Sequence, residues 1–562
     1  MTHSNSDELF YPEHPSSASL SILKKRDRCR YGDMPCDTTL MDNLFSNISG
    51  LYAMGVVVFG CVIPIADIFS EEPQAFLFEG FYVYIYVFSI AFLVYAYVYL
   101  LQNRNLRQKR RRKHGGGSSA IESHVTLKRK YSFDGSRTYH TGSFYLRLGA
   151  VGFGIGSMIQ NGLHFGEFFD ADLFSSCNTV LHGIKPLLAL CFTFIQLYFI
   201  FLNSKMCIHR YRTLARFGIM HMIATNLCVW LENIVGETMR EIEIITKKDQ
   251  PLNQTNIVAD IKNSTDTYKE PCRTSTLMKG VVEMSSPYLY PCSIEYSLIS
   301  AGVLYVMWRN IGKRGITQDQ VERDIEAKSK AQRINVDCSS SSKGLFLGIF
   351  VLVATVISMI TFFVLIDSEA YIDTAVKLEH LTEVAIFVVT SISVILAFHR
   401  MQYLKFDFEK EVDLEESLLF LSLGGVYLFG FFSIVAASLS KESNGLLIVL
   451  SSVLGMFQAS LQTVFLLNGL RRSAWKRDDE KEKPGREFVT FLLMCNIALW
   501  GIDTFEVQRS LANPVQLDFY GEVAWTILNH ISVPLNIFYR FHSTVCLSNI
   551  WKNAWKRKVP LI

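Results

Sequence analysis

Long apolar runs constrain this chain more than any other feature. Twelve of them are long enough to cross a hydrocarbon core of ~30 Å as a helix. Of the 562 residues, 49% are hydrophobic and 19% are charged, and this charged fraction lies below the ~25% of a typical soluble domain. A backbone in lipid must satisfy its own hydrogen bonds, so such runs fold as helices. The sequence therefore predicts an all-α polytopic membrane protein.

The basic linker 313–344 divides the predicted spans into two groups of six. We expect a disordered cytosolic N-terminus over 1–46, an N domain over 47–312, a C domain over 345–550 and a cytosolic C-terminus over 551–562. The predicted transmembrane helices are 48–69, 77–101, 142–166, 179–203, 212–236, 291–312, 345–367, 376–398, 414–438, 445–469, 487–507 and 521–546.

Charged residues in the loops predict the orientation. Lys and Arg concentrate in 102–141, 204–211, 313–344 and 471–486, whereas the alternate loops include short acidic ones. Because basic loops remain in the cytosol, both termini are predicted to be cytosolic. No secretory signal lies near Met1, so the first span is predicted to act as its own signal.

The loop 238–290 is then predicted to face the outside. It contains N-glycosylation acceptor sequences at Asn253 and Asn263, which agrees with that placement. The 12 cysteines form neither a recognisable disulfide framework nor the CxxC pairs of a zinc site. Pairing near the outer face stays open among Cys177, Cys272 and Cys292.

Two short patterns occur once in each group of spans. Asn226-Leu-Cys-Val-Trp230 in the fifth span is echoed by Asn496-Ile-Ala-Leu-Trp500 in the eleventh. Gln196-x-x-Phe199 in the fourth span is echoed by Gln462-x-x-Phe465 in the tenth. The patterns predict a tandem duplication, and because six is even, the two repeats would be parallel.

Polar side chains inside the spans are the candidate functional residues. Asn496 and Asp503 are seven residues apart and share a helix face, and Glu506 follows. Asn226 and Glu237 are eleven residues apart and also share a face. An ionisable group in a span is costly and usually faces a bundle interior or a water-filled cavity, which favours a functional role.

Most ionisable groups lie towards the predicted outer ends of their spans. Gln160, His164 and Glu167 share one face of the third span, and His221 and Glu232 share a face of the fifth. Imidazole titrates near pH ~6.5, so these groups suit the sensing of external acid. The acid-sensing candidates are His164, Glu167, Glu232, Glu295 and His221.

Proton transfer suits side chains that both accept and donate, and it needs no wide pore. Carboxylates, imidazoles, phenols and amides bridged by water can all take part in such transfer. The twelfth span adds His530 and Tyr539, with Pro534 removing a backbone hydrogen bond between them. The candidates for a proton pathway are Glu237, Asp503, Gln196, Tyr539, His530, Asn226, Asn496, Gln462 and Glu506.

Structural explanations compete with these roles. Gln or Asn in a span can serve only as an interhelical hydrogen-bond partner. Carboxylates near helix ends, such as Glu295, Glu379 and Glu383, can reach the membrane interface, and His530 can be a satisfied core histidine. The basic loops are topology signals first and lipid contacts second.

Two function classes fit these residues equally well: a proton channel and a proton-coupled transporter of a small solute. A transporter predicts a cavity with paired charges at mid-membrane, whereas the carboxylates here cluster outward. A membrane enzyme would need a signature such as HExxH or GxSxG, and the sequence has neither.

Several stretches resemble the otopetrin family. They are 142–158, Thr225-Asn-Leu-Cys-Val-Trp230, 294–299 with Tyr305-Val-Met-Trp308, and 537–543, and the likeness extends over all twelve predicted spans. The resemblance implies a non-enzymatic, proton-selective channel of the plasma membrane that extracellular acid opens. It also implies homodimers, with lipids or sterols at the domain and subunit interfaces, and zinc as an inhibitor rather than a cofactor.

The resemblance also implies roles for single residues. Glu237 is similar to the acidic residue that ends the fifth helix of the family, and His530 to the histidine of the twelfth. Gln196, Asp503 and Tyr539 resemble a polar triad where the two domains meet.

Two positions depart from the family pattern. His164 stands where many relatives carry Glu, and Glu232 stands where many carry Arg. Both changes alter the charge of the outer N domain.

Overall fold

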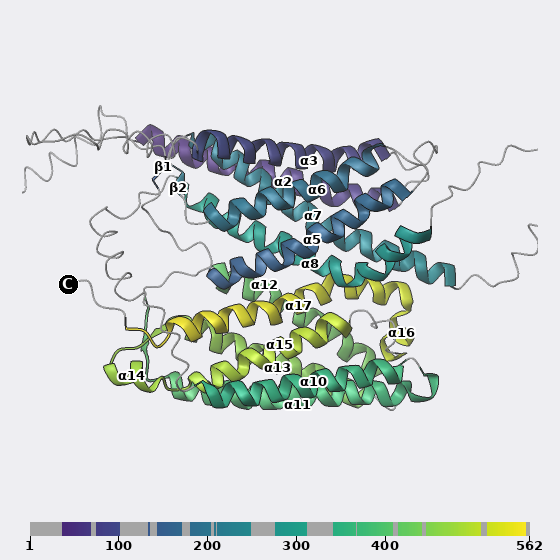
Figure 1. The fold of residues 1–562 in the computed structure, drawn as a ribbon, viewed down its shortest axis with the longest axis vertical. Helices are drawn as coiled ribbons and strands as arrows, with labels where there is room; N and C mark the ends of the chain where they lie inside the picture. Colours follow the sequence, from purple (N-terminus) through teal and green to yellow (C-terminus); the bar gives the residue numbers. More distant parts are fainter. Residues whose placement is uncertain are drawn as a thin grey trace, which may run out of the picture.

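Helices that run side by side build nearly all of the described chain (Figure 1). The computed structural model describes residues 36–68, 75–101, 133–134, 143–170, 180–203, 207–208, 211–248, 276–311, 341–366, 368–408, 414–440, 445–506 and 514–557. The glycosylation candidates Asn253 and Asn263, together with Cys177 and Cys272, lie outside these residues. Cys292 is described, and its thiol lies 3.7 Å from the carbonyl oxygen of Tyr288.

The long helices before residue 312 form what we call the N half, which is purple to teal in Figure 1. They are α2 (Cys36–Ile68), α3 (Ala75–Tyr95), which continues as the π-helix η1 (Ala96–Leu101), α5 (Phe144–Asp170), α6 (Val180–Asn203), α7 (Arg212–Lys248) and α8 (Thr276–Arg309).

The long helices after residue 341 form the C half, which is green to yellow in Figure 1. They are α10 (Ser342–Ile366), α11 (Ile372–Met401), α12 (Leu414–Leu439), α13 (Gly445–Gly469), α15 (Arg486–Glu506) and α17 (Glu522–Asn553). The short helices η3 (Glu369–Tyr371), α14 (Arg477–Glu482) and α16 (Pro514–Tyr520) lie between them.

The described residues include two pairs of very short antiparallel strands. Strand β1 (Phe133–Asp134) pairs with β2 (Cys207–Ile208), and β3 (Lys405–Phe406) pairs with β4 (Arg472–Ser473). Figure 1 shows β1, β2 and α14 at one end of the helix bundle and α16 at the other.

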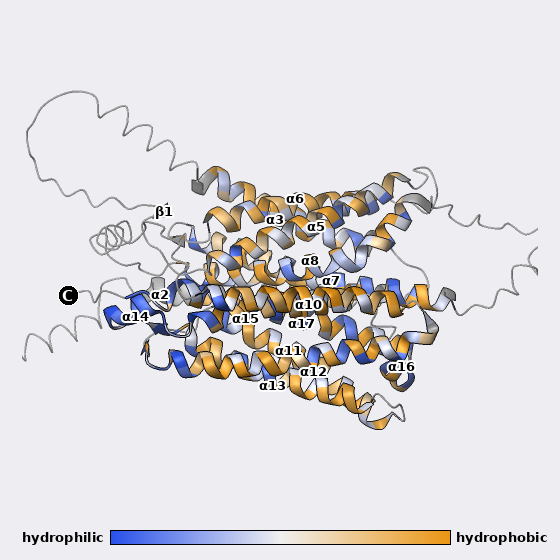
Figure 2. Cartoon of the chain, turned by 60° about the horizontal axis from the view of Figure 1, so that its bottom comes forward, coloured by the Kyte–Doolittle hydropathy of each residue, from blue (hydrophilic) through white to orange (hydrophobic). Residues whose placement is uncertain are grey.

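Hydropathy identifies the protein as a polytopic membrane protein. Within the described residues, nine helices are long and apolar enough to cross a membrane. The most apolar is α10, with a mean hydropathy of 2.9 over a window that is only 17% buried, so most of its apolar surface faces outward. Figure 2 shows apolar residues along the lengths of the long helices and polar residues on α14 and α16.

Helices α5, α8 and α17 are as long as the others but are not among those nine. All three contact helices of both halves: α17 packs on α5, α7 and α8, and α12 also packs on α8. A helix that other helices surround meets less lipid, so it tolerates more polar residues. This position explains their weaker apolar signal.

The predicted loop 238–290 is helical at both ends. Helix α7 continues to Lys248 and α8 begins at Thr276, so residues on both sides of 249–275 are helical. The two extensions interact, since Arg240 donates to Ser286 Oγ at 2.8 Å and Ser286 donates to Glu237 at 2.9 Å. Hydropathy cannot detect such extensions because tertiary hydrogen bonds stabilise them.

The packing pattern of the N half recurs in the C half. In the N half α2 packs on α7, α3 on α6, and α5 on both α6 and α8. In the C half α10 packs on α15, α11 on α13, and α12 on both α13 and α17. The two halves therefore have the same order of neighbouring helices.

One close approach between the halves depends on a glycine. A Cβ added to Gly149 of α5 would overlap the ring of Phe541 of α17. Phe541 also meets Phe153, one turn further along α5, with ring centroids 4.7 Å apart. The missing side chain at Gly149 lets α17 approach the N half closely.

Candidate functional site

A polar cavity of about 240 Å³ lies between α5, α6, α7 and α8 of the N half. Five residues predicted from the sequence line it: Asn226, Glu237, His164, Glu167 and Glu232. Gln160, which was predicted to share a face with His164 and Glu167, lines it too and accepts a hydrogen bond from Ser293 at 2.5 Å. The residues that helix periodicity placed on shared faces therefore line one cavity.

A pair of amide side chains adjoins this cavity, because Asn226 is one of its lining residues. Gln196 of α6 donates to Asn226 of α7 at 2.9 Å, and Asn226 donates back to Gln196 at 2.9 Å. Asn226 also donates to the carbonyl of Met222, one turn earlier in α7, at 2.7 Å. Tyr296 of α8 accepts from Gln196 at 3.2 Å and donates to the carbonyl of Thr193 at 3.0 Å.

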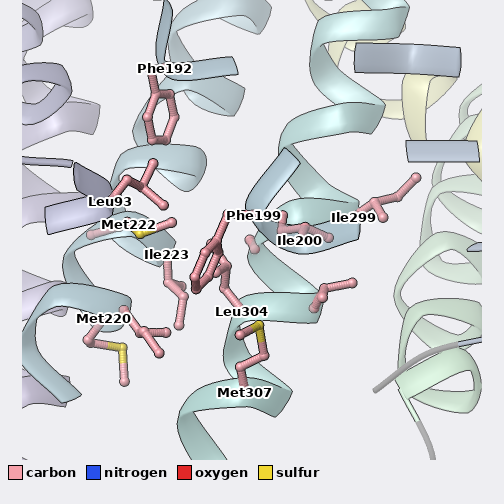
Figure 3. Close-up of a cluster of buried hydrophobic side chains, with 14 of the residues drawn as sticks. Leu93, Phe192, Phe199, Ile200, Met220, Met222, Ile223, Ile299, Leu304 and Met307 are labelled. Atoms are coloured by element: carbon pink, nitrogen blue, oxygen red, sulfur yellow. The ribbon is translucent and has the colours of Figure 1, made fainter. Parts of the chain in front are cut away.

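Apolar side chains fill the N half beyond the amide pair. Phe199 and Ile200 follow Gln196 in α6, and Met222 and Ile223 precede Asn226 in α7 (Figure 3). Leu304 of α8 completes this packing. The polar cavity therefore reaches the amide pair from one side only.

Ion pairs line the wide part of the cavity. Lys185 of α6 pairs with Glu232 of α7, and the ammonium also lies over the ring of Tyr82 at 4.8 Å. His164 lies 3.5 Å from Glu167. The patterns in the sequence do not identify Lys185 as a site residue, although a lone lysine within the apolar run 180–203 is a detectable signal.

Glu237 belongs to the same set of charges. Arg240, one turn further along α7, lies 3.5 Å from the Glu237 carboxylate. Glu79 of α3 lies 2.7 Å from His182 of α6. The cavity wall thus combines carboxylates, imidazoles and fixed cations within a few ångströms of one another.

Two acid-sensing candidates lie elsewhere. His221 contacts the hydroxyl of Tyr52 through Nδ1 at 2.8 Å and the carbonyl of Ile85 through Nε2 at 3.1 Å. Both ring nitrogens are therefore satisfied in a contact between α2, α3 and α7. Glu295 is 1% exposed, and neither carboxylate oxygen has a hydrogen-bond partner within the described residues.

A second polar cavity, of about 90 Å³, lies in the C half. Asp503 of α15 lines it together with Glu379, His380 and Glu383 of α11 and Arg540 of α17. His380 Nδ1 lies 3.0 Å from Glu383 and 3.2 Å from the hydroxyl of Ser451. The sequence placed these three α11 residues near the end of their span, where they could simply reach the membrane interface. It gave no sign that they face a cavity.

An amide pair lies beside this cavity as well. Gln462 of α13 donates to Asn496 of α15 at 2.8 Å, and Asn496 donates back at 3.0 Å. Gln458 extends the network by donating to Gln462 at 3.0 Å and accepting from Arg540 at 2.7 Å. Tyr539 donates to the carbonyl of Ala459 at 2.7 Å, as Tyr296 does to that of Thr193 in the N half.

Arg540 is the main site residue that the patterns in the sequence do not identify. Its side chain is 3% exposed and its Nε lies 3.6 Å from Asp503, which is 8% exposed. An arginine inside the predicted twelfth span was the available signal, since a buried guanidinium needs a carboxylate or several acceptors.

The structure does not join Gln196, Asp503 and Tyr539 in one triad. Gln196 bonds within the N half, to Asn226 and Tyr296. Tyr539 bonds within the C half, and Asp503 pairs with Arg540 there. Gln196 therefore belongs to the network of the N half, and Asp503 and Tyr539 belong to that of the C half, because each half satisfies its own amides and phenols.

His530 makes a different link between the halves. Its Nε2 lies 3.2 Å from Glu241 in the extension of α7, and its ring packs against Tyr290 of α8 at 5.6 Å. Glu506 is the last residue of α15, and its side chain lies outside the part of the chain that the structure describes. Within the described residues, no group of three or more His, Cys, Asp or Glu side chains suits a metal ion.

The helices and cavities together define a polytopic membrane protein with titratable groups inside its helix bundle. Residues 145–265 and 251–541 match the model of the otopetrin family. The chain belongs to the otopetrin family.

Curated relatives from flies to mammals are similar to this chain. It is 40% identical to the proton channel OtopLc of Drosophila melanogaster over 450 residues, which are 75% of this chain and 28% of that protein. It is 25% identical to the proton channel OTOP2 of Mus musculus, covering 74% of this chain and 83% of that protein. The proton channel OTOP1 of Danio rerio is 23% identical over 76% of this chain and 82% of its own length. The chain thus spans under a third of OtopLc and most of the other two.

Proposed function

We propose that this protein is a proton channel. The observation that supports it most directly is the pair of polar cavities, each lined by carboxylates and imidazoles and each adjoining a reciprocal amide pair. Membership of a family whose relatives are named proton channels agrees with this function.

The proposed route begins at the titratable walls of the cavities. A proton bound at Glu167 or Glu237 exchanges through water with neighbouring groups and reaches Asn226 in the N half. In the C half the corresponding groups are Glu383 and His380, with Asp503 deeper. Apolar packing beyond Gln196 and Asn226 closes the N half in this conformation, so conduction there requires that packing to open and admit water.

The proposed topology has twelve spans, with the three polar helices α5, α8 and α17 crossing the membrane at the centre of the bundle. Both termini lie in the cytosol of a plasma-membrane protein, and protons flow inward down their electrochemical gradient when the outside acidifies. The basic loops and the end of the bundle that holds β1, β2 and α14 support this orientation.

The proposed domains are an N domain over 47–312 and a C domain over 345–550, joined by the linker 313–344 and related by duplication. The recurring helix packing supports this division. So do the two amide pairs and the tyrosine bonds beside them. We further propose a homodimer with lipids or sterols at its interfaces, and zinc as an inhibitor.

A proton-coupled transporter is the alternative class. One observation favours it: Asp503 and Arg540 form the buried charge pair that such a transporter predicts. The small volume of the C-half cavity, about 90 Å³, argues against a bound solute, because ligand cavities usually measure ~300 Å³ or more.

Reconstitution separates the two classes. The purified chain is placed in liposomes that contain a pH-sensitive dye, with a K⁺ gradient and valinomycin to balance charge. A channel acidifies the lumen under an inward acid gradient with no added solute, and zinc slows this flux. Glu237→Gln is expected to reduce it. Flux that appears only with an added solute would assign the protein to the transporters, and absence of any flux would refute both.

A further inference from the structure

The C half holds a buried charge pair whose counterpart in the N half is uncharged. Asp503 follows Asn496 by seven residues, and the residue seven after Asn226 is Asn233. Arg540 follows Tyr539 directly, and the residue after Tyr296 is Ser297. Asn233 and Ser297 both line the N-half cavity. At the two corresponding positions, the C-half cavity therefore has charged side chains and the N-half cavity has neutral ones.

The protein holds the Arg540 guanidinium in place from several sides. It donates to Gln458 Oε1 at 2.7 Å and lies 5.3 Å from the ring centroids of both Phe387 and Tyr539. In the N half Phe192 occupies the position of Gln458, four residues before the glutamine of the amide pair. The C half therefore has a dedicated acceptor for Arg540.

The contact between Arg540 and Asp503 is close but incomplete. Their nearest atoms are 3.6 Å apart, which is longer than a hydrogen bond. Arg540 Nε and Asp503 Oδ2 are both buried, and neither has a hydrogen-bond partner within the described residues. One carboxylate oxygen thus remains available to a proton in a cavity that also contains Glu379, His380 and Glu383.

We propose that the Asp503–Arg540 pair excludes metal cations from the C-half cavity and so determines its selectivity for protons. A metal ion that binds Asp503 must approach a fixed guanidinium whose charge is weakly screened in a buried site. A proton instead bonds covalently to Asp503 Oδ2 and leaves it again to a neighbouring water, so no second cation needs room beside Arg540. This inference rests on the proposed channel function and assigns conduction to the C half.

The test is the permeability ratio of Na⁺ to H⁺ in cells that express the full chain. Reversal potentials are measured at fixed pH while external Na⁺ is exchanged for a large organic cation. Arg540→Gln removes the fixed charge and is expected to raise the ratio by at least about tenfold, since one unit charge about 4 Å away contributes more than that at an effective dielectric constant of about 20. Arg540→Lys keeps the charge and is expected to remain selective.

Two further variants complete the experiment. Arg486→Gln is the matched control, because Arg486 is a buried arginine of the same half that stacks on Trp551 at 4.0 Å outside the cavity. Its permeability ratio is expected to equal that of the wild type. Arg540→Ser also removes the fixed charge, replacing it with the residue type that follows Tyr296 in the N half, and is expected to lose selectivity as well. It tests the inference if Arg540→Gln misfolds.

Each result has one meaning. An unchanged ratio in a conducting Arg540→Gln or Arg540→Ser variant would overturn the inference while leaving the channel function intact. If both variants reach the surface but carry no current, the inference is also overturned, because removing a barrier cannot abolish flow. Absence of proton current in the wild type would instead refute the proposed function itself.

Discussion

Gln196 and Asn226 donate a hydrogen bond to each other at 2.9 Å in both directions. Each amide is at most 1% exposed, so each supplies the partner that the other would otherwise lack. Gln462 and Asn496 repeat the arrangement in the C half. These bonds fix the registers of α6 on α7 and of α13 on α15.

The amide pair predicts non-additive effects on stability. Gln196→Leu and Asn226→Leu are each expected to lower the free energy of unfolding by ~1–3 kcal/mol, because each leaves a buried amide without its partner. The double variant is expected to lose less than the sum of the two. Chemical denaturation in detergent micelles measures the free energy of unfolding of the wild type, the two single variants and the double variant. Additive losses would show that the pair is not a coupled unit.

The pair between Lys185 and Glu232 predicts that a charge swap restores function. Lys185→Glu places two carboxylates together and is expected to reduce both expression and proton flux. Lys185→Glu/Glu232→Lys re-forms an ion pair across α6 and α7 and is expected to recover most of the wild-type flux in liposomes. A swapped protein no better than the single variant would mean that the two charges act separately.

Gly149 predicts a steric effect at the contact between the halves. Gly149→Leu drives a side chain into the ring of Phe541 and is expected to cost ~1–3 kcal/mol. Gly152 lies on the same helix, and a Cβ added there meets nothing within 4 Å, so Gly152→Leu is the matched control. Thermal melting in detergent compares the two. Equal melting temperatures would contradict the close approach of α5 and α17.

His530 and Glu241 form a polar contact between the two halves. Nδ1 of His530 lies 2.8 Å from the carbonyl of Thr526, which only accepts, so Nδ1 donates there. Nε2 lies 3.2 Å from the Glu241 carboxylate. Glu237 of α7 and Tyr290 of α8 also face this site.

His530→Leu is expected to lower the free energy of unfolding by ~1–3 kcal/mol, because it leaves the Glu241 carboxylate without this contact. Thermal melting in detergent measures the loss, with Glu241→Gln as the second variant. Equal melting temperatures for His530→Leu and the wild type would show that the contact does not stabilise the protein.

Helix periodicity predicted the N-half site largely correctly. Asn226 and Glu237 were placed on one face, as were Gln160, His164 and Glu167, and the structure brings all five to one cavity. This prediction was possible because the residues of each set belong to one helix, and their spacing along that helix determines which face they share. The glutamine and asparagine patterns likewise identified residues that do contact each other.

The sequence did not predict which side chains of different helices contact each other. Lys185 and Arg540 were not selected, because a lone cation in an apolar run does not reveal its carboxylate. The expected triad of Gln196, Asp503 and Tyr539 is divided between two networks for the same reason. His221 shared a predicted face with Glu232, yet its ring nitrogens contact α2 and α3.

The amino-acid sequence by itself determined that this chain forms membrane helices, which faces of those helices are polar, and where two similar patterns occur. Those properties follow from hydropathy and from the fixed geometry of one helix, both of which are local. Only the tertiary structure decided which polar faces meet, how far α7 and α8 extend, and which cation neutralises each buried carboxylate. These features depend on contacts between segments that are far apart in the chain. The energies of such contacts cannot be predicted from a local sequence pattern.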